Sequence, residues 1–179
     1  MLVVQKYGGS SVANKERIFN VAGRIAEAYD KGNSVVVVLS AQGDTTDELI
    51  EKAKEINPSA SRREMDMLLS TGEQQSVALM AMALEKMGYP AISLNAMQVG
   101  IDTTKAHSNA KIKTISTGRI YEELERKNIV IITGFQGVNQ YEDITTLGRG
   151  GSDTTAVAIA AALGADICGV YTDVDGGYT

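Results

Sequence analysis

The sequence contains a single cysteine, Cys168, so the chain cannot form an internal disulfide. Cys168 lies in the apolar run ADICGVY, which predicts a buried small side chain rather than a reactive thiol. We also expect no signal peptide, because MLVVQKYGG is not a basic segment followed by a long apolar stretch. Together these features predict a protein of a reducing compartment, the cytoplasm.

Clusters of basic residues and long apolar runs are absent as well. The 17 Lys and Arg residues are spread among 22 Asp and Glu residues, and the formal net charge is -5. Nucleic-acid and anionic-membrane surfaces need clustered basic residues. The longest apolar stretch, residues 156–163, is far shorter than the roughly 20 residues of a membrane span. We therefore expect no nucleic-acid partner and no membrane partner.

Two further absences concern catalysis. The only histidine, His107, lies in the polar stretch TTKAHSNAK, which predicts a surface or local structural role. No G-x-x-x-x-G-K-[ST] segment occurs, so the chain has no Walker A loop. Any phosphate site must therefore be built in another way.

What is present is an alternation of short β-branched runs with helical patterns. Continuous apolar runs are typical of parallel strands that are buried on both faces. Such runs predict strands over residues 2–5, 34–39, 91–94, 129–133 and 167–171. Helical periodicity covers residues 14–31, 73–87, 117–127 and 154–163. The alternation predicts an α/β fold, an αβα sandwich with a mainly parallel central sheet, with a hairpin over residues 137–145.

Methionines are numerous around residues 65–87, and we interpret them as core filling rather than as a binding groove. In parallel sheets ligands bind at the carboxyl ends of the strands. The loops that follow the strands are therefore the places to look for chemistry.

The loop after the first strand reads Lys6-Tyr7-Gly8-Gly9-Ser10-Ser11 and leads into a helix. Paired glycines let the backbone approach an anion, and a helix N-terminus offers free N–H groups. The loop is also consistent with an ordinary tight turn. The second loop, residues 40–47, either caps the helix that contains Leu49 or binds an anion through its hydroxyls.

A third loop, residues 145–155, surrounds Arg149 with three glycines and then enters a helix through Ser152 and Asp153. Arginine can clamp a carboxylate with two parallel hydrogen bonds, and glycines leave room for the ligand. This combination favours a function over a plain turn. The acidic loop at residues 171–176 either holds Mg²⁺ or ribose or is a solvated turn.

Two glycine-rich anion sites and an arginine clamp indicate one place for a polyphosphate and one for a carboxylate substrate. Phosphoryl transfer depends mainly on positioning and on neutralisation of charge. A carboxylate nucleophile is ionised at neutral pH and needs no general base. The lack of a histidine in these loops agrees with such a reaction.

The motifs resemble those of the aspartate kinases within the amino-acid kinase family. The resemblance runs in family order along the whole chain, and its GRGGSD and SAxGxTT segments are specific to these kinases. It rests on KYGGSS (6–11), SAQGDTTDEL (40–49), LLSTGEQ (68–74), GFQG (134–137), TTLGRGGSDTTA (145–156) and YTDVDG (171–176). It implies transfer of the γ-phosphoryl group of ATP to the β-carboxylate of L-aspartate, giving 4-phospho-L-aspartate. That reaction opens the biosynthesis of lysine, threonine and related amino acids.

The resemblance also implies roles for individual residues. Lys6 and Asp153 would be catalytic, and Mg²⁺ would bridge the phosphates of ATP. The aspartate site would consist of Thr46, Glu73, Phe135, Arg149, Ser152 and Asp153. The nucleotide would contact Lys6, Gly8, Gly9, Ser10, Thr172, Asp173 and Tyr178.

Three positions depart from the family pattern: Gln42 replaces a methionine, Ser108 a glycine, and Gly177 a branched apolar residue. The glycine leaves the placement of Tyr178 open. Residues 1–179 would be an incomplete amino-acid kinase catalytic domain, without the C-terminal nucleotide-side segment and the ACT regulatory domains.

The alternatives are a fragment that binds aspartate or nucleotide without turnover, a self-associating fragment, and a relative that phosphorylates acetylglutamate or a nucleotide. A homo-oligomer or association with a regulatory subunit is expected of the full-length protein, of the bacterial class regulated by end-product amino acids.

Overall fold

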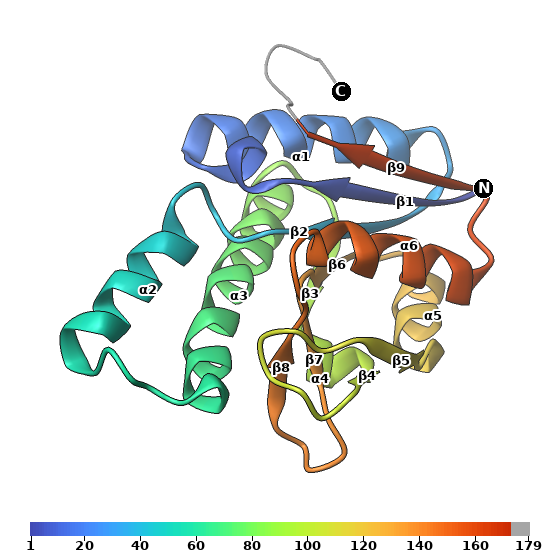
Figure 1. The fold of residues 1–179 in the computed structure, drawn as a ribbon. Coiled ribbons are helices and arrows are strands. Elements are labelled where there is room, and N and C mark those ends of the chain that lie inside the picture. The colour runs from blue at the N-terminus through green and yellow to red at the C-terminus, as the bar shows by residue number, and fades with distance from the viewer. Residues whose placement is uncertain (173–179) are drawn as a thin grey trace.

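A computed structural model describes residues 1–172 of the 179-residue chain (Figure 1). The strands are β1 (Leu2–Tyr7), β2 (Ser34–Leu39), β3 (Ala91–Leu94), β4 (Ile101–Thr103), β5 (Ile112–Ile115), β6 (Ile129–Thr133), β7 (Gln136–Val138), β8 (Ile144–Thr146) and β9 (Ile167–Tyr171). The helices are η1 (Gly9–Val12, a 3-10 turn), α1 (Lys15–Asp30), α2 (Thr45–Ile56), α3 (Arg62–Lys86), α4 (Ala96–Val99), α5 (Gly118–Glu125) and α6 (Gly151–Leu163).

Five parallel strands form the central sheet in the order β3-β6-β2-β1-β9. The order differs from the order along the chain, since β6 lies between β3 and β2, and helices lie in the connections between these parallel strands. β2 lies at the centre of the sheet and its last five residues are buried, as the unbroken run SVVVVL predicts. The predicted parallel sheet is thus confirmed.

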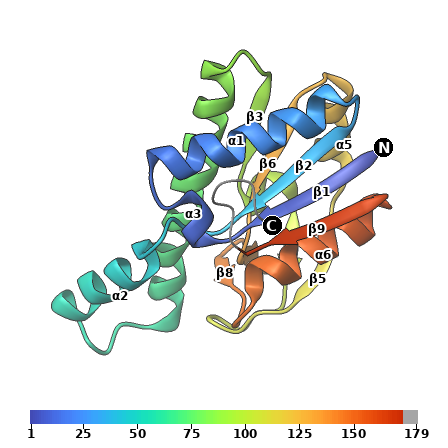
Figure 2. The same ribbon diagram turned by 90° about the horizontal axis from the view of Figure 1, so that it is seen from above.

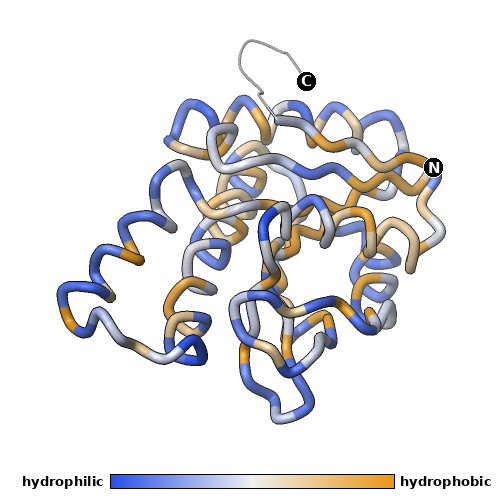
Figure 3. Tube along the Cα trace, in the orientation of Figure 1, coloured by the Kyte–Doolittle hydropathy of each residue, from blue (hydrophilic) through white to orange (hydrophobic). Residues whose placement is uncertain are grey.

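Helices cover both faces of this sheet (Figure 2). On one face α1 and α3 pack on alternate strand residues such as Val35, Val37 and Ile131. On the other face α5 and α6 pack on Val36, Val38 and their neighbours. Hydrophobic segments coincide with the central strands, whereas α2, which buries no residue, is largely hydrophilic (Figure 3). The predicted αβα sandwich is confirmed.

A second, four-stranded sheet has the order β5-β4-β7-β8. Its β7–β8 hairpin is the one predicted over residues 137–145. β4 and β5 escape prediction because they have only three and four residues and show no long apolar run. This sheet matters for the site because β8 leads directly into the Arg149 loop.

α3 begins at Arg62, well before the predicted start at residue 73. The Ser61 side chain caps it by accepting a hydrogen bond from the Glu64 amide. In the first half of α3 the buried positions include the polar residues Asp66, Ser70 and Glu73, so the apolar periodicity is weak there.

The interpretation of the methionines as core filling is wrong for most of this helix. Met80 is fully buried, but Met67, Met82 and Met87 are exposed. Their positions turn away from the sheet, and an α-helix that is covered on one side leaves its other side in solvent.

The prediction of a buried Cys168 is also wrong, because this cysteine is exposed. In the described part of the chain β9 pairs only with β1, so it forms a sheet edge, and Ile167 and Val170 are exposed as well.

Among residues 1–172, no helix has both the length and the apolar character required to cross a bilayer.

Candidate active site

A cavity of about 360 Å³ opens where the loops after β1, β2 and β6 meet the start of α6. Its position at the carboxyl ends of parallel strands is the usual place for a ligand in such a sheet. Eight of the predicted site residues line it together: Lys6, Gly9, Thr46, Glu73, Phe135, Arg149, Ser152 and Asp153. The structure therefore gathers residues from five separate motifs into one place.

Lys6 lies near the end of β1, and only 8% of its surface is exposed. Its Nζ lies 2.8 Å from Oδ1 of Asp153, whose side chain is half exposed. An ammonium group held in low solvent access interacts more strongly with an incoming anion than a surface lysine does. Lys6 thus supplies a fixed positive charge to the cavity.

The loop after β1 packs tightly on the loop after β2. A Cβ atom on Gly9 would lie 2.7 Å from the carbonyl oxygen of Ala41, a distance that real Cβ atoms do not reach. The Gly43 amide donates to the carbonyl of Gly9 at 2.9 Å. Only glycine fits at position 9, which gives the Gly8–Gly9 pair a structural reason besides anion binding.

The arginine loop ends where α6 begins. Gly150 is the N-cap, with φ at 75°, a conformation that glycine adopts without strain. The first turn of α6 carries Ser152 and Asp153, so the positive end of the helix dipole faces the cavity lining. Ser40 donates from Oγ to Ser152 Oγ at 2.9 Å and fixes this turn to β2.

Glu73 projects from α3 and is 2% exposed. Burial raises the pKa of its carboxyl group to about 8, although the hydrogen bond from Gln136 opposes this rise. Gln136 Nε2 donates to Glu73 Oε1 at 2.8 Å and to the Ser70 carbonyl at 3.0 Å. A buried carboxyl that faces a cavity is suited to bind a cationic ligand group, which would lower this pKa.

The raised pKa of Glu73 predicts a specific pH dependence of stability without ligand. Because the folded state holds this proton up to about pH 8 and the unfolded state releases it near 4.5, stability should fall as pH rises between these values. The slope is at most about 1.4 kcal/mol per pH unit. Glu73→Gln should remove this component, as measured by urea unfolding at several pH values. A slope that the variant leaves unchanged would contradict the assignment.

The remaining predicted residues lie partly inside and partly outside the described chain. Gly8 and Ser10 follow β1, and Ser10 Oγ donates to the Thr172 carbonyl at 3.4 Å. This contact places Thr172 beside the glycine loop. The predictions for Asp173 and Tyr178 concern positions outside the described residues.

Two residues of the site were not singled out from the sequence, namely Ser40 and Gln136. Both lie inside the segments SAQGDTT and GFQG, so the sequence pointed to the right segments but not to these two residues. Their roles depend on partners 112 and 63 positions away, Ser152 and Glu73, which single-sequence patterns do not specify.

Comparison with known proteins agrees with this arrangement. The family model for the amino acid kinase family matches residues 1–179. Aspartokinases of Mycolicibacterium smegmatis and Geobacillus stearothermophilus are each 58% identical to 99% of this chain. The chain spans only 42% and 44% of the lengths of these relatives.

Solved structures give the same result for the fold. The crystal structure of aspartate kinase from Synechocystis superposes with a TM-score of 0.83 at 50% identity, over 97% of this chain and 29% of that one. Aspartokinase III of E. coli in complex with aspartate and ADP gives a TM-score of 0.84 at 25% identity, over 98% of this chain and 50% of that one. The chain belongs to the amino acid kinase family.

Proposed function

We propose that the protein transfers the γ-phosphoryl group of ATP to the β-carboxylate of L-aspartate and forms 4-phospho-L-aspartate. The observation that carries the proposal is the convergence of Lys6, Arg149 and the buried Glu73 on one small cavity. This charge pattern suits a ligand with two carboxylates and an ammonium group. The aspartokinase names of the relatives and the aspartate and ADP complex of one structural neighbour support the same substrate pair.

In this proposal each charged group of aspartate has a partner of opposite sign. Arg149 clamps the α-carboxylate, while Glu73 and Asp153 attract the ammonium group. Thr46, Phe135 and Ser152 complete the walls of the aspartate site. The β-carboxylate is ionised at neutral pH and attacks phosphorus directly, so the site needs no general base.

The nucleotide would bind on the side of the glycine loop. Lys6 and the backbone at Gly8, Gly9 and Ser10 would hold the transferring phosphoryl group and neutralise its charge. Mg²⁺ would enter on the phosphates of ATP, where it neutralises charge. Thr172, beside Ser10, would contact ATP, and the predicted ATP contacts of Asp173 and Tyr178 belong to the same proposal.

Residues 1–179 would then be part of a kinase catalytic domain that works in the biosynthesis of lysine, threonine and related amino acids. A homo-oligomer or a regulatory subunit, and a location in the cytoplasm, belong to the same proposal.

The experiment that tests the proposal is a hydroxylamine trap. The protein is incubated with Mg-ATP, L-aspartate and hydroxylamine, and aspartyl hydroxamate is measured; N-acetylglutamate replaces aspartate in a parallel reaction. We expect hydroxamate from aspartate and none above background from acetylglutamate. Aspartate binding without hydroxamate would instead favour a binding fragment, and a preference for acetylglutamate would reject the proposed substrate.

A further inference from the structure

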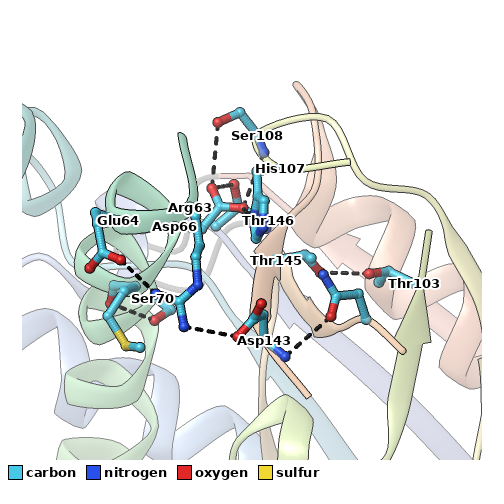
Figure 4. Close-up of polar contacts among 12 residues, drawn as sticks. Arg63, Glu64, Asp66, Ser70, Thr103, His107, Ser108, Asp143, Thr145 and Thr146 are labelled. Carbon is cyan, nitrogen blue, oxygen red and sulfur yellow. Dashed lines mark hydrogen bonds and ion pairs between the residues drawn. The ribbon is translucent and has the colours of Figure 1, made fainter. Parts of the chain in front are cut away.

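A second polar cluster is centred on Asp66, a residue of α3 that is completely buried (Figure 4). Its Oδ2 atom accepts hydrogen bonds from His107 Nδ1 at 2.8 Å, the Ser108 amide at 3.1 Å and the Thr146 amide at 3.0 Å. Its Oδ1 atom accepts from Thr146 Oγ1 at 2.7 Å. A carboxylate oxygen can only accept, so His107 carries the proton on Nδ1 in this contact.

A buried carboxylate is costly unless hydrogen bonds satisfy it. The donors to Asp66 come from two segments that are about 40 and 80 positions away in the sequence, residues 107–108 and β8. The one side chain therefore ties α3 to both segments. Loss of Asp66 would leave the buried Thr146 amide without its acceptor. A buried donor that is left without a partner lowers stability by more than a typical hydrogen bond contributes.

Both segments are connected to residues 146–148, which directly precede Arg149. The Ala110 amide donates to the Thr146 carbonyl at 3.0 Å, and Ala110 forms an isolated bridge with Leu147. A Cβ atom on Gly148 would lie 2.7 Å from Asn109 Oδ1, so residues 107–110 and the loop are in close contact. Arg149 lies only three residues after Thr146, next to the segment that these contacts hold in place.

α3 also carries Glu73, seven positions after Asp66. Residues seven apart in a helix lie on the same face, about 10 Å apart along the axis. Asp66 thus anchors the arginine loop to the same rigid helix that presents Glu73 to the cavity. Arg149 and Glu73, the groups proposed to bind the α-carboxylate and the ammonium group of aspartate, are therefore both positioned relative to α3.

Ser108, one of the donors to Asp66, has a backbone conformation that is uncommon for a residue other than glycine. Its φ is 66°, a left-handed conformation that costs a non-glycine residue about 1 kcal/mol or more. The sequence resemblance expects glycine there, which would adopt this conformation freely. The Ser108 amide donates to Asp66 at 3.1 Å in this conformation, and this hydrogen bond offsets part of its cost.

Two neighbouring contacts hold the β7–β8 hairpin less strongly than the Asp66 contacts do. Arg63 reaches Asp143 at 2.8 Å, but its side chain is 44% exposed, and an exposed ion pair contributes little. Thr103 and Thr145 share a buried hydroxyl contact of 2.6 Å, which joins β4 to β8 but does not involve α3.

We propose that Asp66 is a positioning residue for aspartate recognition, which holds β8 and residues 107–110 on α3 and so sets Arg149 opposite Glu73. The inference rests on the proposed function, because it assumes that Arg149 binds the substrate carboxylate. It adds a residue outside the cavity lining to the set that determines substrate affinity.

The test measures the Kd of L-aspartate and of ATP by calorimetry, and amide hydrogen exchange of residues 144–151 by mass spectrometry. Asp66→Ala removes every acceptor, Asp66→Asn keeps one oxygen for the amide donors, and Arg63→Ala is the matched control on the same helix. We expect Asp66→Ala to weaken aspartate binding roughly 10- to 100-fold and Asp66→Asn to restore part of it. The Kd of ATP should stay within about threefold of wild type in the Asp66 variants. The Kd of aspartate in Arg63→Ala should also stay within about threefold of wild type.

The exchange measurement keeps the two hypotheses separate. If wild type binds aspartate and a folded Asp66→Ala binds it equally well, the positioning role is rejected and the proposed function stands. If wild type does not bind aspartate, the proposed function fails, and faster exchange confined to residues 144–151 would still support the anchoring. Unchanged exchange there would reject it. Should Asp66→Ala not fold, Asp66→Asn and Thr146→Val are compared in the same way.

Discussion

Replacement of Lys6 by alanine is expected to lower the formation of aspartyl hydroxamate by roughly 10³-fold, while aspartate affinity changes by less than about threefold. Negative charge accumulates on the equatorial oxygens of the transferred phosphoryl group, and Lys6 is the buried ammonium group beside the glycine loop. Arg149 and Glu73, the proposed partners of the α-carboxylate and the ammonium group, remain in the variant. The effect should therefore fall mainly on turnover and not on substrate binding.

The controls for this prediction come from the same chain. Lys52→Ala, on α2, removes an exposed positive charge that does not line the cavity and should leave turnover unchanged. Lys6→Arg keeps the charge but replaces a compact ammonium by a planar fork, so partial activity is expected. Full activity in Lys6→Ala would show that the phosphoryl group is neutralised elsewhere.

Replacement of Arg149 by alanine is expected to weaken aspartate binding by roughly 10²-fold, measured by calorimetry. A guanidinium group can donate two parallel hydrogen bonds to a carboxylate, and charge-assisted bonds are worth about 1.5–3 kcal/mol each. Arg149→Lys retains the charge without the fork and should give an intermediate affinity. ATP affinity should be retained, because the proposed nucleotide contacts lie on the Lys6 side.

An unchanged Kd for aspartate in Arg149→Ala would reject Arg149 as the clamp. Arg62→Ala is the matched control, because Arg62 is an exposed arginine at the start of α3 and does not line the cavity. Equal losses in the two variants would point to a general effect of net charge instead of a specific contact.

The central sheet could be predicted from the sequence because its signal is local. Residues 34–39 and 129–133 are apolar except for Ser34 and Thr133 at their ends, and the observed β2 and β6 have the same bounds. The edge strand β9 shows the limit of this approach. Its apolar run predicts the strand correctly but not the exposure of Cys168, because exposure depends on which neighbours a strand has.

The gathering of the site could also be predicted, because the motifs follow successive strands and the carboxyl ends of parallel strands meet at one edge. The role of Asp66 could not. Its partners His107 and Thr146 come from segments that sequence patterns assign to separate loops. His107 was expected to have a surface or local structural role, but its ring contacts Asp66, 41 positions away, and only 19% of its side chain is exposed. Only the folded structure shows that Asp66 is the partner of His107.

One calorimetric experiment at neutral pH compares three ligands: L-aspartate, succinate, which lacks the ammonium group, and β-alanine, which lacks the α-carboxylate. We expect aspartate to bind at least about tenfold more tightly than either analogue, because each analogue loses one charge-assisted contact. In Glu73→Gln the advantage over succinate should shrink. Equal affinity for aspartate and succinate in wild type would show that Arg149 and Glu73 do not bind the two charged groups of the amino acid.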